Sequence, residues 1–487
     1  IGTSHDDSVE RFTFIALQKQ IPSLLCHLMK TQEPTAPYST GLYGAARTKA
    51  MLAVSLAVLL AQIDYAIANV ALPDIGADLH SSASDTVWVV NAYQLASLSA
   101  LLPLAAAGAW IGYARMCIIG ITLFMLSSVV CAAAPSLLVL TIARAVQGIG
   151  AASMLSVVSA LIRFIYPENE LGKGFSLNTL VVGIGMALGP TVAGLILAIA
   201  PWPWLFWINL PIGALTLLLA LNSLPVTPKI GHMPDPAGAG LCFIAFTAIG
   251  LGGDSVAHAS GVPLTLGLFM LGIVTMWLLV RKEAGLPSPI MPVDLLKGRG
   301  FRVAFMVGTL SYIGSNFFIV SAPFALRDHY GWSATATGLL MTPWAFGLIV
   351  AASVIRRFAD RFPAPVLSSF GLLCTMTGFF ALRMLPAHPS AFDVVWRIGL
   401  SGFGFGVFQV PNNRAMLLTA PSGREGGASG MVQVSRQSGQ TWGAIGAAFV
   451  LRLDPLTGPI SCMDAAAACA GGAALLSASR LWARKNR

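Results

Sequence analysis

Several polar side chains, among them an acid and a base, lie inside long runs of apolar residues. Gln62 and Asp64 sit near the middle of MLAVSLAVLLAQIDYAIANVALP, and Arg144 and Gln147 lie in ARAVQGIGAA. A spacing of three places Arg144 and Gln147 on nearly the same face of a helix. A carboxylate can take up and release a proton, and a nearby guanidinium alters the proton affinity of that acid. These residues are therefore candidates for a proton relay or a substrate path.

A charged group at the centre of a membrane span costs roughly 2.5–3.5 kcal/mol on insertion scales. Asp64 and Arg144 therefore each need a partner, a proton or a water-filled cavity. Two structural alternatives stay open: Asp64 could cap a broken helix, and Arg144 could tie helices together through backbone carbonyls. Arg436, deep in MVQVSRQSGQTWG, poses the same question. We expect four residues to face a substrate or a cavity: Gln62, Tyr93, Gln147 and Arg436.

Motifs for enzymatic or metal chemistry do not accompany these residues. The sequence has no GxxxxGK[ST] phosphate loop, no GxSxG and no HExxH, and its seven histidines and seven cysteines lack ligand spacing. The net charge of +9 comes from basic residues scattered singly between apolar runs, without a basic stripe. We therefore expect no enzyme, no ATP-driven pump, no metal or cofactor, and no nucleic-acid partner.

The composition indicates the class of protein. Hydrophobic residues make up 56% of the 487 and charged residues only 10%, whereas soluble domains carry roughly 25% charged residues. A soluble chain could not hide that much apolar surface. Helices of about 20 apolar residues can remain in lipid, because each satisfies its own backbone hydrogen bonds.

Apolar windows predict about fourteen transmembrane helices in a pattern of six, two and six. The first six lie near 51–73, 87–110, 115–134, 136–162, 175–199 and 203–224. Two weaker candidates lie near 237–253 and 263–280. The last six lie near 303–326, 333–355, 364–382, 392–413, 427–450 and 459–480. The fold class expected is thus all-α and membrane-embedded.

The distribution of Lys and Arg predicts the orientation. With the N-terminus inside, the alternate connections on the other side hold only Arg327, Arg383 and Arg452, and most other basic residues fall on the cytoplasmic side. We therefore expect a multi-pass protein of the plasma (inner) membrane with both termini in the cytoplasm.

The expected domains follow from the spans. Residues 1–48 would be an N-terminal extension, disordered or non-native, with an amphipathic surface helix as the alternative. Residues 49–225 would form the first six-helix bundle and 301–487 the second. Residues 226–300 would be a linker with the two additional helices and a cytoplasmic loop.

Four motifs occur in order with spacing that resembles a known family. They are IDYAIANVALPDI (Ile63–Ile75), WVVNAYQLA (Trp88–Ala96), RAVQGIGAA (Arg144–Ala152) and GMALGPTVAG (Gly185–Gly194). Together they resemble the major facilitator superfamily in its fourteen-span drug:proton antiporter branch. WPWLFWINLPIG (Trp202–Gly213) and GFGFGVFQVPNNRAM (Gly402–Met416) look like the methyl viologen and quaternary ammonium efflux subgroup.

This resemblance implies a fold and a mechanism. The fold would be two six-helix bundles around a central cavity, with two extra helices between the halves. Alternating access around a midplane site would export lipophilic cations in exchange for protons. Asp64 and Arg144 would carry proton coupling. Four residues match the antiporter helix: Gly185, Gly189, Pro190 and Gly194.

The chain departs from the family pattern in its gating loops. After the second helix, GAWIGYARM has Ala109 where an acid is expected, and of the basic set only Arg115 remains, with Ala114 beside it. The matching loop of the second half, RRFADRF, keeps Asp360 and Arg361. Pro203 stands where the family usually has arginine. We expect weakened gating or coupling rather than a different fold.

Two other functions remain open. The chain could transport another solute, such as a sugar, an organic anion or a lipid, or it could be a non-transporting sensor or a decayed paralogue. Asp64 in an acid-poor membrane region favours a cation or a proton. The sequence leaves open the oligomeric state and the choice between proton and sodium coupling.

Overall fold

The computed structural model describes residues 41–485 apart from 168–169, 228–234, 285, 287–288, 359–360 and 420–424. Most of the proposed N-terminal extension therefore lies outside the described residues. Thirteen helices in the described part are long and apolar enough to cross a membrane. A fourteenth, α18 (Glu425–Leu453), is long enough at 29 residues but more polar. The expectation of about fourteen helices in an all-α fold is confirmed.

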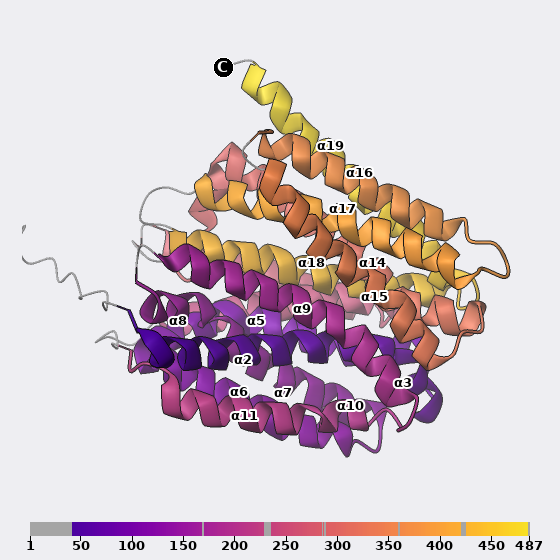
Figure 1. Cartoon of the computed structure of the whole chain (residues 1–487), viewed down its shortest axis with the longest axis horizontal. Coiled ribbons are helices and arrows are strands. Elements are labelled where there is room, and N and C mark those ends of the chain that lie inside the picture. Colours follow the sequence, from indigo (N-terminus) through magenta and orange to yellow (C-terminus); the bar gives the residue numbers. More distant parts are fainter. Residues whose placement is uncertain are drawn as a thin grey trace, which may run out of the picture.

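The first six spans run from α2 to α11 (Figure 1). They are α2 (Gly44–Val70), α5 (Trp88–Ile111), α6 (Tyr113–Ala132), α7 (Leu137–Leu155) with α8 (Val158–Ile165), α9 (Leu171–Leu197), and α10 (Trp204–Trp207) with α11 (Asn209–Ser223). The short α3 (Leu72–Asp78) and α4 (Ala83–Thr86) join α2 to α5. The sequence predicted one helix over 136–162, but the helix is interrupted at 156–157, between α7 and α8.

The last six spans form the second bundle. They are α14 (Arg299–Phe324) with its π-helical end η3 (Ala325–His329), α15 (Ala334–Phe358), α16 (Ala364–Arg383), α17 (Ala391–Leu418), α18, and α19 (Gly458–Lys485). A short 3₁₀ helix, η2 (Val293–Lys297), precedes α14. The glycines of α17 allow close packing: a Cβ on Gly404 would lie 2.5 Å from the Gly371 carbonyl oxygen of α16.

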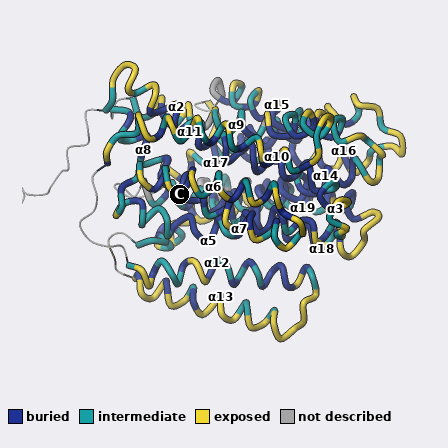
Figure 2. The backbone as a smooth tube through the Cα atoms, turned by 90° about the horizontal axis from the view of Figure 1, so that it is seen from below, coloured by how far each residue is buried: buried dark blue, intermediate teal, exposed yellow. Residues whose placement is uncertain are grey.

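The two extra helices, α12 (Pro236–Ala257) and α13 (Val262–Glu283), lie side by side along one flank of the molecule (Figure 2). α12 packs against α5 of the first half and α18 of the second. α13 leaves large apolar side chains exposed, among them Leu266, Met270 and Ile273. Such an exposed apolar face is suited to contact with lipid.

The helices run between two ends of the molecule. We name the end where α2 begins the Arg47 end, and the end where α2 finishes and α3 follows the Asp74 end. At the Asp74 end the halves meet through an ion pair between Asp74 and Arg327. The Ser84 hydroxyl also donates there to the carbonyl of Ala448, at 3.0 Å. The two halves are therefore joined directly by polar contacts, in addition to apolar packing.

Candidate functional site

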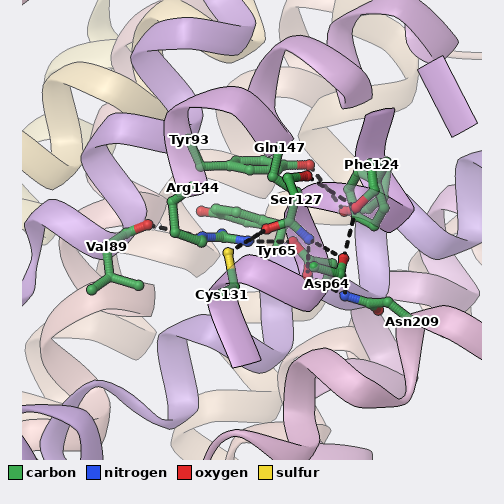
Figure 3. A network of polar contacts seen from close by, with 12 residues as sticks. Asp64, Tyr65, Val89, Tyr93, Phe124, Ser127, Cys131, Arg144, Gln147 and Asn209 are labelled. Carbon is green, nitrogen blue, oxygen red and sulfur yellow. Dashed lines mark hydrogen bonds and ion pairs between the residues drawn. The ribbon is translucent and has the colours of Figure 1, made fainter. Parts of the chain in front are cut away.

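The centre of the first half holds an ion pair between Asp64 of α2 and Arg144 of α7 (Figure 3). Nη1 of Arg144 lies 2.5 Å from Oδ2 of Asp64, and the two side chains are 0% and 1% exposed. Two residues 80 positions apart in the sequence are thus brought together without access to solvent. Each neutralises a charge that would otherwise be costly in this apolar setting.

Amide side chains complete the coordination of Asp64. Gln147 Nε2 donates to Oδ1 at 3.0 Å, and Asn209 Nδ2 of α11 donates to the same oxygen at 2.7 Å (Figure 3). Gln147 also donates to the Ser128 hydroxyl of α6 at 2.8 Å and accepts from Arg144 Nη1 at 2.7 Å. Both carboxylate oxygens are therefore occupied by protein donors.

Arg144 also contacts α5 of the first half. Its Nε donates to the Val89 carbonyl of α5 at 3.0 Å, and its guanidinium carbon lies 4.3 Å from the centre of the Tyr93 ring. Arg144 thus does tie helices together through a backbone carbonyl, the structural role that the sequence left open, while it also pairs with an acid. Asn209 and Ser128 were not predicted as site residues, although Asn209 lies in the conspicuous WINLP segment.

A second site, the central cavity, lies between the two halves. We define it by Ala61, Gln62, Tyr65, Tyr93, Gln94, Ser97, Leu155, Arg436, Gln437 and Gln440. The first seven come from α2, α5 and α7, and the last three from α18. Of the four residues predicted to face a substrate or a cavity, Gln62, Tyr93 and Arg436 line this cavity, and Gln147 lies in the ion-pair network. Tyr93 belongs to both places, because the face of its ring covers Arg144.

Polar bonds cross the central cavity from one half to the other. Gln437 Nε2 donates to the Ser97 hydroxyl at 2.9 Å. The Tyr65 hydroxyl donates to Oδ1 of Asn316, and Asn316 Nδ2 in turn donates to the Gln440 carbonyl at 2.5 Å. The two halves are thus joined at mid-span by bonds that must break if they separate.

Arg436 differs from Arg144 in having no hydrogen-bond or ion-pair partner among the residues that the structure describes. It is 9% exposed, and its Nε has no hydrogen-bond acceptor. Within the described residues no Asp or Glu lies within ion-pair distance of it, and none lines the central cavity. The only other buried arginine in the described part of the chain is Arg144, which has its carboxylate.

An apolar pocket adjoins the central cavity at Tyr65. It is lined by Tyr65, Ala66, Met186, Pro190, Phe318, Ile319, Met341 and Trp344. Trp344 stacks on Phe379 with ring centres 5.8 Å apart, and Phe318 packs against both rings. The indole N–H of Trp344 has no acceptor. This pocket therefore has an aromatic wall with one free donor.

The glycine-rich α9 packs between the two halves. A Cβ on Gly185 would lie 2.7 Å from Cβ of Gln62 on α2, and one on Gly189 would collide with Ala66. One on Gly194 would lie 3.0 Å from the Thr335 carbonyl of α15, and Pro190 lines the apolar pocket. All four predicted residues of this helix thus stand at close contacts with α2 or α15.

The candidate gating residues lie away from the cavity. Arg115 is an exposed residue in the first turn of α6, and Arg361 is exposed in the turn before α16. Ala109 is partly buried near the end of α5. Asp360 lies outside the described residues.

Comparison with known proteins gives the same family for most of the chain. Residues 54–444 match the sequence pattern of the Major Facilitator Superfamily. The uncharacterized transporter YebQ of Escherichia coli strain K12 is 38% identical over 443 residues, which is 91% of this chain and 97% of YebQ. The multidrug resistance protein Stp of Mycobacterium tuberculosis is 28% identical, over 81% of this chain and 74% of Stp.

The fold also matches solved structures. A POT family transporter in complex with 5-aminolevulinic acid has a TM-score of 0.66 and 14% identity, with 91% of this chain and 97% of that chain covered. At this identity the likeness concerns the arrangement of helices alone.

Proposed function

Because the chain belongs to the major facilitator superfamily, we propose that it is a secondary active transporter that exports drug-sized organic molecules in exchange for protons. The observation that carries this proposal is the buried Asp64–Arg144 pair, whose guanidinium is covered by the ring of Tyr93, a residue that also lines the central cavity. An acid that can be protonated beside a cavity between two bundles is the arrangement that proton-coupled alternating access requires.

Protonation of Asp64 changes the charge balance of the first half. While Asp64 is ionised, its charge and that of Arg144 cancel over 2.5 Å. A proton on Asp64 leaves Arg144 as an uncompensated buried cation, a state that costs several kcal/mol. A rearrangement of α2, α5 and α7 that gives Arg144 another partner then lowers the free energy. Proton binding would in this way drive the movement of the first half.

The movement acts on the contacts between the halves. Tyr65 follows Asp64 directly on α2, and its hydroxyl bonds to Asn316 of α14. α9 contacts both α2 and α15 through positions where only small residues fit. A shift of α2 would therefore reach the second half over two routes, one polar and one by packing.

The membrane and the orientation are part of the proposal. The basic residues that the sequence assigns to cytoplasmic connections include Arg47, in the first turn of α2, and Arg115, in the first turn of α6. Both lie at the Arg47 end of the molecule. We propose that this end faces the cytoplasm, with both termini inside and the chain in the plasma (inner) membrane. Asp74 and Arg327 would then close the outer side.

The charge of the substrate needs separate consideration. The sequence resemblance favours lipophilic cations, and a relative is a multidrug resistance protein. A cation in the central cavity would need a free acid, and Asp64 has both oxygens engaged. The proposal therefore rests on drug-sized organic molecules as a class and leaves cationic cargo to the assay.

Transport by purified protein in liposomes tests the proposal. Vesicles with an acidic lumen are mixed with rhodamine 6G, a cation, or sulforhodamine B, an anion on a related xanthene core. The wild type should accumulate at least one dye in a gradient-dependent manner, and dissipating the gradient with a protonophore should stop it. Protein-free vesicles correct for passive redistribution.

The decisive variant is Asp64→Asn, which keeps the size of the side chain and removes the acid. It should abolish gradient-driven accumulation. Asp454→Asn, which removes a carboxylate at an exposed turn, is the matched control and should transport like the wild type. Full gradient-driven transport by Asp64→Asn would refute the role of this carboxylate.

A further inference from the structure

The central cavity carries a positive charge that nothing in the described protein neutralises. Its lining residues include one ionisable cation, Arg436, and no acid. Asp64, which lies between the lining residues Gln62 and Tyr65 on α2, is already matched by Arg144. If the cavity is the substrate path, as proposed above, the missing counter-charge has to come from what binds there.

We propose that Arg436 forms an anion subsite, so that the transporter selects amphipathic aromatic molecules bearing a carboxylate or sulfonate over lipophilic cations. The inference rests on the proposed function only in taking the central cavity as the binding site. It assigns to Arg436 the role of a specificity-determining residue that contacts substrate.

The unpaired hydrogen-bonding atoms around Arg436 match an acceptor-rich ligand. Arg436 Nε in the central cavity is a buried donor without an acceptor among the described residues, and so is Trp344 Nε1 of the adjoining pocket. Unmade bonds of buried donors are costly. Acceptor oxygens of a carboxylate or sulfonate satisfy such donors, and a guanidinium binds such oxygens in a fork of two bonds.

One acceptor in the cavity is unpaired as well. Gln437 Oε1 has no donor, while the other atom of that amide is fixed by Ser97. It can accept from a hydroxyl or amide N–H on the same ligand. The set thus fits an acid that also carries a neutral donor group.

The apolar pocket supplies the place for an aromatic body. Each of the two spaces measures only about 20 Å³ in this conformation, and Tyr65 lines both. A ligand that enters as the halves separate would have its acid at Arg436 and its ring system beside Phe318 and Trp344. Stacking against such side chains favours planar aromatic groups.

A cation meets the opposite situation. It would have to lie in the same cavity as the charge of Arg436 without an intervening acid, and like charges a few ångströms apart repel strongly at low dielectric. The face of Tyr93, which could otherwise hold a cation, already covers Arg144 at 4.3 Å. The cavity therefore discriminates against cations by repulsion as well as by missing partners.

Binding to the purified full chain in lipid nanodiscs tests the proposal without any gradient. Sulforhodamine B and rhodamine 6G are titrated separately by equilibrium dialysis, and binding to empty nanodiscs is subtracted. The wild type should bind sulforhodamine B at least about 10-fold more tightly than rhodamine 6G. Arg436→Gln should lower the affinity for sulforhodamine B about 10-fold or more and leave that for rhodamine 6G unchanged or higher.

Two further variants separate charge from folding. Arg436→Lys keeps the charge but loses the planar fork, and it should retain the preference for the anion with reduced affinity. Arg452→Gln removes a positive charge from the far end of the same helix, roughly 24 Å away at 1.5 Å per residue, and should bind both dyes as the wild type does. All variants are compared by size-exclusion profile.

The outcomes distinguish this inference from the proposed function. Preference for rhodamine 6G, no detectable binding of sulforhodamine B, or anion binding unaffected by Arg436→Gln would each overturn the anion subsite. Loss of proton-driven transport with intact anion preference would instead refute the proton coupling and leave the subsite standing.

Discussion

Among the residues whose burial the structure describes, each half of the molecule buries one arginine, and the two have opposite surroundings. Arg144 in the first half has a carboxylate at 2.5 Å, a glutamine and a backbone carbonyl. Arg436 in the second half lies among tyrosines and glutamines and has no acid. The same residue type in the same apolar setting thus has two roles. Where the protein supplies the counter-charge the arginine can respond to a proton, and where it does not, a ligand must.

The largest expected effect is on stability, when each arginine is replaced in turn. Arg144→Gln leaves Asp64 buried without its counter-ion and should destabilise the protein by about 3–5 kcal/mol. Arg436→Gln removes a buried charge that has no partner and should leave stability unchanged or raised. Thermal unfolding in detergent, followed by the loss of monodisperse protein, measures both.

A double variant identifies the cause of that loss. Asp64→Asn combined with Arg144→Gln removes both charges and should recover most of the stability that Arg144→Gln alone loses. If the double variant is as unstable as the single one, or if Arg436→Gln is equally damaging, the contrast between the two arginines does not hold.

The second prediction concerns the close contact between α9 of the first half and α15 of the second. Gly338 of α15 lies directly against the Pro190 carbonyl and Gly194 of α9, where an added side chain cannot fit. Gly338→Val should push the halves apart at the Asp74 end and reduce transport about 10-fold or more, while dye binding in the central cavity persists.

A glycine in open space is the control for this variant. Gly267 of α13 has nothing near the position of an added Cβ, so Gly267→Val should transport normally. Wild-type transport by Gly338→Val would show that the α9–α15 contact does not take part in the cycle.

A smaller effect is expected where the gating loops of the two halves differ. The first half has Ala109 in place of an acid and retains the exposed Arg115. Ala109→Glu should restore an acidic residue at the Arg47 end and raise transport about two- to threefold, since exposed ion pairs contribute up to about 1 kcal/mol. Initial rates in liposomes measure the change. An unaltered rate would show that the lost acid does not weaken gating.

The smallest effect on stability is expected at His258, which directly follows α12 where this helix contacts both halves. The pKa of His258 is raised, chiefly by its hydrogen bond to Asp254, 3.1 Å away. Asp85 lies 3.8 Å from the ring, and Arg452 of α18 donates to the preceding Ala257 carbonyl. A histidine whose pKa is higher in the folded than in the unfolded state stabilises the fold. This stabilisation is complete at pH values below the unfolded-state pKa of about 6.5, and it is lost as pH rises through the folded-state pKa.

His258→Gln therefore tests the joint by its pH dependence. It should lower the unfolding temperature by about 1 °C at acidic pH and have no effect at alkaline pH. A larger loss at alkaline than at acidic pH would contradict the assigned pairing of His258 with Asp254.

The number and type of helices could be predicted from sequence, because apolar runs of membrane length have few alternatives in a chain this poor in charge. The interruption between α7 and α8 at residues 156–157 could not, since neither residue is a proline or glycine. α18 was found despite its polar face, because the residues around Arg436 are interspersed with apolar ones.

The candidate site was predictable in part. Asp64 and Arg144 stand out because charges are rare within membrane spans. Asn209 and Ser128 do not, since single amides and hydroxyls are common there, and only the fold places them against Asp64 and Gln147. The lack of a partner for Arg436 is a property of three-dimensional arrangement, and no pattern of spacing could have indicated it.

Proton movement driven by substrate tests the central claim most directly. Purified protein is reconstituted in vesicles that contain a pH indicator, and a substrate gradient directed inward is imposed at equal pH on both sides. Exchange predicts that substrate entry makes the lumen more alkaline with the wild type and leaves its pH unchanged with Asp64→Asn. Substrate entry without a pH change in the wild type, or an equal pH change in Asp64→Asn, would contradict it.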